Sequence, residues 1–321
     1  MRRFLIIVIL LALLGAGAWY WEEANYAAPG PSPQGAVVLI KPGEGVSSIA
    51  QQLQTAGVVS NADLFRLGLR IRGQQSQLKA GEYWFPPQAS MASVAGILIA
   101  GKSIEHKLTA AEGLTSDMIY KIVAADPVLV GDAGPEPAEG TLLPETYLFT
   151  RGMTRAHMLA MMETAQKKFV DAQWDTRASG LPVKTKAQAI VLASVVEKET
   201  AIAEERRHIA SVFENRLRQG IRLESDPTII YGITKGYPLG RGIRESELTG
   251  ATPYNTYVIP GLPPAPICNP GKDAIAAVLD PENTQDLFFV ANGKGGHVFT
   301  SSFAEHQKNV ARWRQVEKAH H

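Results

Sequence analysis

The stretch from Ala193 to Tyr231 determines how this chain is read: it contains A-S-V-V-E-K-E-T at 193–200, S-V-F-E-N-R-L at 211–217 and D-P-T-I-I-Y-G at 226–232. Residues 184–199 are mostly apolar up to Glu197, which predicts a buried central helix. A carboxylate at the end of such a run is either paired or partly desolvated, and desolvation raises its pKa. A carboxyl group that keeps its proton can act as a general acid on a C–O bond. We therefore predict Glu197 as a catalytic acid, with a buried structural salt bridge as the alternative.

Glu197 and Glu199 form the nearest pair of acids, but they are two residues apart and point about 200° away from each other on a helix. This argues against a two-carboxylate glycosidase built from this pair. We expect Glu199 to be solvated, or paired with Arg206 or Arg207. A substrate could lie beside Glu197 on a stripe of small and apolar residues: Ile190, Ala193 and Ser194.

A second helix is predicted at 204–219, with an apolar face that carries Arg216 inward. The buried guanidinium needs a carboxylate partner, which either Asp226 or Glu197 could provide. The opposite face is predicted to be solvated and carries Glu205, Arg206, Glu214 and Arg218. Asp226-Pro227 then predicts a turn before the apolar residues that follow.

Several polar and aromatic side chains are candidates for glycan binding. Tyrosine rings stack on sugar rings, and amides bond hydroxyl or acetamido groups. The Pro-rich segment 254–269 is typical of a binding loop, although aromatic residues are also common in cores. The predicted substrate-binding residues are Asn215, Asp226, Tyr231, Tyr254 and Asn255.

The N-terminus predicts a membrane anchor. Arg2 and Arg3 precede a run of apolar and small residues at 4–20, and Glu22 ends the run after an aromatic cluster at 19–21. A run of this length can just span a bilayer, and the arginines would stay in the cytoplasm. The alternative is a cleaved signal peptide, because residues 16–18 read A-G-A. Both interpretations place residues 22–321 outside the cytoplasm.

Composition narrows the function classes. The 321 residues have a net charge of +1, which gives no reason to expect a nucleic-acid partner. Cys268 is the one cysteine, so an intramolecular disulfide and a cysteine-based zinc site are excluded. No second histidine or carboxylate follows His297 at metal-binding spacing, and we expect neither a metal nor another cofactor.

We expect an α+β protein with four parts: an anchor at 1–21, a linker at 22–36, a small module at 37–100 and a larger domain at 101–319. The module should contain a strand at 37–40, a helix capped by Ser47, a helix at 62–72 and a strand at 80–85. It resembles a LysM sugar-binding domain through K-P-G-E-G-V-S-S-I-A-Q-Q-L; the alternative is a spacer that never touches glycan. Further elements are expected as helices at 91–100, 158–172 and 303–318, a strand at 104–108, a helix opening at 112–119 and a hairpin of 287–290 with 297–300.

The motifs together resemble the endolytic murein transglycosylases of the YceG-like (MltG) family. Besides the three motifs quoted first, the chain has E-G-T-L-L-P-E-T-Y at 139–147, P-Y-N-T-Y-V-I-P-G-L-P-P at 253–264 and G-K-G-G-H-V-F-T at 293–300. The resemblance covers nearly the whole chain, and the first acid of V-E-K-E, which is the family's catalytic glutamate, is Glu197.

The resemblance implies a lyase that cleaves the β-1,4 bond between N-acetylmuramic acid and N-acetylglucosamine and leaves a 1,6-anhydro end. Glu197 would serve as both acid and base, and the substrate would be peptidoglycan glycan strands, nascent and lipid-linked. The location implied is the bacterial inner membrane, with a cytoplasmic N-terminus, a periplasmic catalytic domain and peptidoglycan synthases as partners. The alternatives are an anchored glycan-binding scaffold without catalysis and a hydrolytic muramidase.

Overall fold

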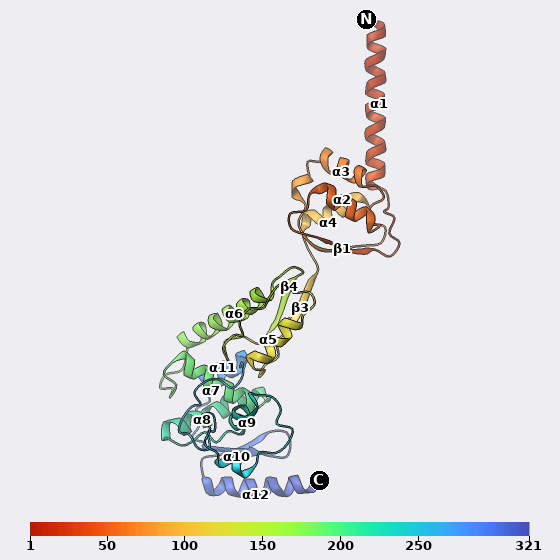
Figure 1. Ribbon diagram of the computed structural model, residues 1–321. Coiled ribbons are helices and arrows are strands. Elements are labelled where there is room, and N and C mark those ends of the chain that lie inside the picture. Colours follow the sequence, from red (N-terminus) through yellow and green to blue (C-terminus); the bar gives the residue numbers. More distant parts are fainter. Residues whose placement is uncertain (321) are drawn as a thin grey trace. The chain divides into compact units, whose positions relative to one another are not determined.

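The structure is a computed structural model that describes residues 1–320, with side chains described as far as residue 317. It is a mixed α/β protein with an N-terminal apolar helix (Figure 1). The chain forms two compact units, one of residues 1–106 and 148–152 and the other of residues 107–147 and 153 onward. Each unit has its own hydrophobic core.

Unit 1 contains a two-stranded antiparallel sheet covered by short helices. Strand β1 (Ala36–Ile40) pairs with β2 (Gly81–Phe85) so that Val38 lies opposite Tyr83. Between the strands come α2 (Val46–Thr55), α3 (Ala62–Ile71) and a short 3-10 turn (Gln75–Gln77), and α4 (Met91–Ala100) follows β2. This is the predicted order of strand, two helices and strand, although α2 is capped by Gly45 rather than Ser47. The likeness of this unit to LysM stays a prediction.

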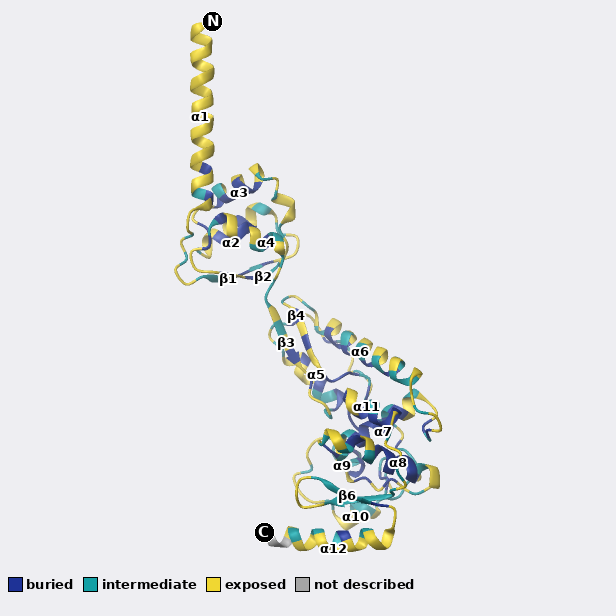
Figure 2. Cartoon of the chain, turned by 180° about the vertical axis from the view of Figure 1, so that it is seen from behind, coloured by how far each residue is buried: buried dark blue, intermediate teal, exposed yellow. Residues whose placement is uncertain are grey.

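Helix α1 (Arg2–Ala27) begins unit 1 and is exposed along its apolar part (Figure 2). It is the one helix, among the residues described, that is long and apolar enough to cross a membrane. The helix continues into the range predicted as a linker, where Tyr26 is buried. Residues 30–32 are also hydrogen-bonded to unit 1. The Gly30 amide donates to Gln88 O at 3.0 Å, and the Gln88 amide donates to Ser32 O at 2.7 Å. The range 22–36 is therefore partly ordered.

Unit 2 is mainly helical. The remaining elements in chain order are β3 (Glu105–Thr109), α5 (Ser116–Ala125), β4 (Thr146–Thr150), α6 (Arg155–Asp175), α7 (Lys186–Glu199), a 3-10 turn (Ala203–Glu205), α8 (Arg206–Gln219), α9 (Asp226–Thr234), α10 (Glu245–Thr249), α11 (Lys272–Leu279), β5 (Phe288–Ala291), β6 (His297–Thr300) and α12 (Phe303–His320). Strands β3 and β4 each have residues in both units. Strand β3 pairs with β4, and β5 pairs with β6 as the predicted antiparallel hairpin.

Helix α7 lies at the centre of the core of unit 2, packed against α8 and α11. Its residues are apolar around most of its circumference, and a helix of that kind becomes buried. Leu192, Ala193, Val195 and Val196 are fully buried. The Thr185 side chain begins the helix by accepting a hydrogen bond from the Gln188 amide at 3.2 Å. Burial of the last turns places Glu197 at the edge of the core.

Two local expectations were wrong, and some elements were missed. Residues 226–234 form helix α9 rather than a turn, because Pro227 occupies the first turn of a helix, where its missing N–H costs nothing. The helix expected to open at 112 begins at Ser116, after the capping residue Thr115. Strand β4 and helix α11 were not anticipated.

Candidate active site

Glu197 lies in the last turn of α7, and 6% of its side chain is exposed. Its Oε2 accepts a hydrogen bond of 2.9 Å from the amide of Gly271. Gly271 is the N-cap residue of α11, so this amide belongs to the positive end of a helix. The carboxyl group is therefore held by a backbone donor that any substitution other than proline retains.

Arg206 joins Glu197 to a second carboxylate. Its Nη2 lies 3.7 Å from Glu197 Oε1 and 3.6 Å from Glu112 Oε2, and its Nη1 lies 3.4 Å from Asp273 Oδ2. The carboxylate of Glu112 also rests against Gly271, where an added Cβ would overlap Glu112 Oε1. Gly271 is thus required for its close approach to Glu112 rather than for its backbone angles.

The environment of Glu197 raises its pKa. Burial has the largest effect, and repulsion from Glu112 acts in the same direction. The hydrogen bond from Gly271 and the positive charges of Arg206 and Lys198 lower the pKa, but they do not cancel the rise. Desolvation and pairing, which were expected as alternatives, therefore occur together at Glu197, and the guanidinium beside it is that of Arg206, which was expected to pair with Glu199.

The stripe on α7 that was expected to receive substrate is covered by residues 266–271, so that prediction was wrong. Ala193 and Ser194 are fully buried. The Ser194 Oγ accepts from the Ile267 amide at 3.0 Å, and the thiol of Cys268 donates to Ser194 O at 3.4 Å. The thiol is itself buried, and burial and the carboxylates of Glu197 and Glu139 raise its pKa.

Glu139 carries a half-buried carboxylate that the sequence did not single out. Its Oε1 accepts from the Ser116 amide at 2.9 Å and from Asn269 Nδ2 at 3.3 Å, and its Oε2 accepts from the Tyr231 hydroxyl at 3.2 Å. Burial raises its pKa, although these donors oppose the rise. Asn269 is also hydrogen-bonded to Leu114 O. Glu139 therefore connects the segment around Leu114 and Ser116 with the segment around Asn269, and residues of both segments, Glu112 and Gly271, lie near Glu197. The only signal in the sequence was the motif E-G-T-L-L-P-E-T-Y, which Glu139 begins.

Two of the predicted binding residues lie together beside Glu139. The ring centroids of Tyr231 and Tyr254 are 4.9 Å apart. Lys235 Nζ lies 5.5 Å from the first ring centroid and 5.4 Å from the second. Tyr231 is buried and Tyr254 is half-buried, so of the two Tyr254 offers more surface to a ligand.

Comparisons with known proteins support this organisation. The model of the YceG-like family matches residues 38–312. The chain belongs to the YceG-like family. It is 29% identical to the endolytic murein transglycosylase of Streptococcus pneumoniae serotype 2 (strain D39) over 97% of this chain, but it spans only 65% of that relative's length. It is 27% identical to the endolytic murein transglycosylase of Bacillus subtilis (strain 168), with 84% of this chain and 82% of that protein covered.

A crystal structure of a YceG-like protein from Listeria monocytogenes has a similar fold. The TM-score is 0.53 at 27% identity, and the match covers 86% of this chain and 99% of the other.

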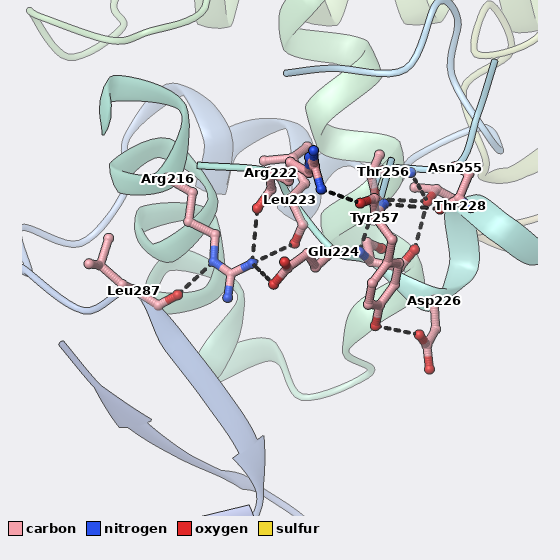
Figure 3. A network of polar contacts seen from close by, with 11 residues as sticks. Arg216, Arg222, Leu223, Glu224, Asp226, Thr228, Asn255, Thr256, Tyr257 and Leu287 are labelled. Atoms are coloured by element: carbon pink, nitrogen blue, oxygen red, sulfur yellow. Dashed lines mark hydrogen bonds and ion pairs between the residues drawn. The ribbon is translucent and has the colours of Figure 1, made fainter. Parts of the chain in front are cut away.

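In this YceG-like chain, the side-chain amides of two predicted glycan-binding residues, Asn215 and Asn255, already donate hydrogen bonds to backbone carbonyls. The Asn215 amide donates to Thr284 O at 2.9 Å and to Asp286 O at 3.0 Å. Asn255 is fully buried and donates to three carbonyls, those of Glu247, Leu248 and Gly250. Asp226 is exposed and accepts a hydrogen bond of 2.7 Å from Tyr257 (Figure 3). A contact between glycan and any of the three stays a prediction.

Arg216 is paired, but with neither predicted carboxylate. Its Nη1 donates to Glu224 Oε2 at 3.1 Å and to the carbonyls of Arg222 and Leu223, both at 3.0 Å (Figure 3). Its Nε donates to Leu287 O at 2.6 Å. Sequence reasoning missed Glu224 because the chain reverses after Gly220, which brings position 224 back beside α8.

Other charged residues also differ from expectation. Glu199 is bonded to the Ser225 hydroxyl rather than to Arg206 or Arg207, and burial, with Asp226 nearby, raises its pKa to about 7. Arg206 and Glu214 lie on the face of α8 predicted to be solvated, yet both are buried. The reason is that α8 has neighbours on more than one side, among them α7 and α11.

His297 pairs with a single acid. Its Nδ1 lies 2.6 Å from Glu205 Oε2. Among the side chains that the structure describes, residues 1–317, no group of three or more His, Cys, Asp or Glu is arranged to hold a metal ion.

Proposed function

We propose that this chain is an endolytic lytic transglycosylase of murein. It would cleave the β-1,4 bond between N-acetylmuramic acid and N-acetylglucosamine within a glycan strand and form a 1,6-anhydro end. The names of the pneumococcal and Bacillus relatives support this activity. The observation that carries the proposal is the buried carboxyl of Glu197, whose pKa is raised and whose Oε2 is held by the Gly271 amide.

Glu197 acts first as an acid. Its carboxyl gives a proton to the glycosidic oxygen as the bond to the muramoyl carbon breaks, and the glycan leaves with a free hydroxyl. The resulting carboxylate then accepts the proton of the muramoyl C6 hydroxyl, whose oxygen attacks the same carbon and closes the anhydro ring. The nucleophile belongs to the substrate, so no second carboxylate is needed to activate water.

Glu112 and Arg206 favour different protonation states of the Glu197 carboxyl group. Before proton transfer, repulsion from Glu112 favours the protonated form of Glu197. After transfer, the Arg206 guanidinium, 3.7 Å from Oε1, and the Gly271 amide stabilise the carboxylate. One carboxyl group can therefore both donate and accept a proton.

Tyr254 is the best placed of the predicted glycan contacts, because its ring is partly open beside the buried Tyr231. Asp226 is also accessible. Binding through Asn215 or Asn255 would require their amides to leave backbone carbonyls, so we assign these two a structural role.

Helix α1 supports a membrane-anchored enzyme. We propose that it spans the inner membrane once with Arg2 and Arg3 in the cytoplasm, leaving the enzyme on the outer side near lipid-linked nascent strands. A tether raises the effective concentration of the enzyme at these strands. Peptidoglycan synthases are then the expected neighbours, and glycan binding by the LysM-like unit is part of the same proposal.

Mass spectrometry of digested glycan tests the activity. The full chain in detergent should release fragments with anhydro ends, which are lighter by one water than hydrolytic products. Glu197→Gln should release none, whereas Glu204→Gln, which changes an exposed carboxylate, should behave as wild type. Fragments with reducing ends would refute the transglycosylase reaction, and binding of nascent strands without cleavage would favour the scaffold.

A further inference from the structure

Helix α1 is joined tightly to α3 within unit 1. Tyr26 is buried, its ring stacks on Phe65 with centroids 6.3 Å apart, and a Cβ on Gly68 would overlap the ring. The guanidinium of Arg72, which follows α3, lies 4.0 Å from the Tyr26 ring centroid and donates to Glu22 Oε1 at 2.8 Å. The orientation of α3 is therefore fixed relative to the last turns of α1.

These contacts between the end of α1 and α3 set the depth of α3 relative to a bilayer. The apolar run at 4–21 rises about 27 Å as a helix, which nearly matches a hydrocarbon core of about 30 Å. Glu22, the next residue, then lies where the headgroups begin, and its partner Arg72 lies at the same level. Tyr26 is about 6 Å further out, and the headgroup layer is itself about 5–7 Å thick. The part of α3 between Phe65 and Arg72 thus falls within that layer.

The outer face of α3 has the composition of a helix that lies at a membrane surface. Arg66, Leu67, Arg70 and Ile71 are all exposed, and Leu67 and Ile71 have 44% and 49% of their surfaces accessible. Isolated exposed aliphatic residues are ordinary, but here they alternate with cations at the depth of the headgroups. The aliphatic side chains can enter the boundary of the hydrocarbon, and the arginines can meet lipid phosphates.

We propose that the exposed face of α3, made of Arg66, Leu67, Arg70 and Ile71, binds the anionic lipid headgroups of the membrane in which α1 is anchored. This inference rests on the proposed insertion of α1. It would hold unit 1 against the bilayer as a second attachment site, so that α1 and the rest of the unit do not tilt freely as one body.

Fluorophores placed in the full chain test the contact and the insertion separately. An environment-sensitive label is attached at Ile71→Cys, at Leu10→Cys in α1 and at Val37→Cys, an exposed position on β1. Strand β1 lies on the side of unit 1 away from α3 in both views (Figures 1 and 2). Cys268 is fully buried, and the unsubstituted chain serves as the labelling blank.

In vesicles that contain phosphatidylglycerol, headgroup-located spin labels should quench the fluorophore at 71 severalfold more than that at 37, and a bilayer-centre quencher should act on position 10. Quenching at 10 with equal, weak quenching at 71 and 37 would overturn the proposal while α1 remained an anchor. Absence of quenching at 10 would overturn both the insertion and the proposal.

A charge-matched pair of variants tests the role of the arginines. Arg66→Gln with Arg70→Gln should reduce quenching at 71 in phosphatidylglycerol vesicles and have little effect in phosphatidylcholine alone. Lys41→Gln with Lys102→Gln removes the same charge from other exposed positions of unit 1 and should change neither. Equal effects of the two pairs would show that net charge, rather than this face, governs the contact.

Discussion

Replacing Glu112 by Gln should lower the pKa of Glu197. The ion-pair distances of 3.6 Å and 3.7 Å share Arg206 Nη2, so the two carboxylates lie at most about 7 Å apart. At an effective dielectric constant of about 20, a unit charge at this distance contributes about 2 kcal/mol, and solvent around the half-exposed Glu112 reduces this to about 1 kcal/mol. The loss of repulsion, together with an Arg206 freed to approach Glu197, should lower the pKa by about one unit.

The pH dependence of glycan cleavage measures this change. A general acid works in its protonated form, so activity should decline as pH rises through the pKa of Glu197. In Glu112→Gln, the high-pH limb of kcat/KM should move down by about one pH unit. Asp273→Asn is the matched control, because Asp273 contacts the same guanidinium but has 71% of its side chain exposed, so that solvent screens its charge more strongly than that of Glu112.

Two outcomes would refute this reasoning. A limb that stays in place, or moves up, would show that Glu112 does not set the proton affinity of Glu197. Equal shifts in Glu112→Gln and Asp273→Asn would mean that release of Arg206, rather than the charge of Glu112, is responsible. A complete loss of cleavage in Glu112→Gln would instead suggest that Glu112 acts as a base toward water, as in the hydrolytic alternative.

Three further changes have expected outcomes. Arg216→Lys should lower the free energy of unfolding by about 2–4 kcal/mol in urea titrations, because an ammonium cannot satisfy three carbonyls and Glu224 together; an unchanged midpoint would contradict this. Glu214 is fully buried, with a pKa raised from 4.5 to about 7, so stability should fall as pH rises between these values. In Glu214→Gln, the free energy of unfolding should fall by about 1–3 kcal/mol less over this pH range, and the same pH dependence as in the wild type would contradict the prediction. Gly271→Ala should displace Glu112 and reproduce part of the downward pH shift of Glu112→Gln, whereas a wild-type profile would show that Glu112 keeps its place.

The helices whose apolar residues recur regularly could be predicted from the sequence. Helices α7 and α8 lie close to the expected ranges because tertiary packing and local pattern agree. Helix α9 was missed because Asp226-Pro227 was read as the start of a turn, although proline is equally suited to the first turn of a helix. The buried charged residues of α8, Arg206 and Glu214, were predicted on the wrong side because periodicity identifies one packed face and gives no warning of a second.

The proposed catalytic glutamate can be singled out in the sequence, but its surroundings cannot. Glu197 stands out as a charge at the end of an apolar run, which is a local signal. The Gly271 amide and Glu112 reach it from segments 74 and 85 positions away along the chain, and no spacing rule connects them. Glu139 was overlooked for the same reason, because its significance comes from Asn269 and Tyr231.

The burial of the Cys268 thiol bears on the proposed location of the protein outside the cytoplasm. Disulfide exchange needs a thiolate that other molecules can reach, and this sulfur is neither accessible nor readily ionised, because it is buried near two acids. The folded protein can therefore carry an unpaired cysteine through an oxidising compartment without cross-linking to its neighbours. Unfolding would remove this protection, so the same sulfur would mark damaged copies by the covalent aggregates that they form.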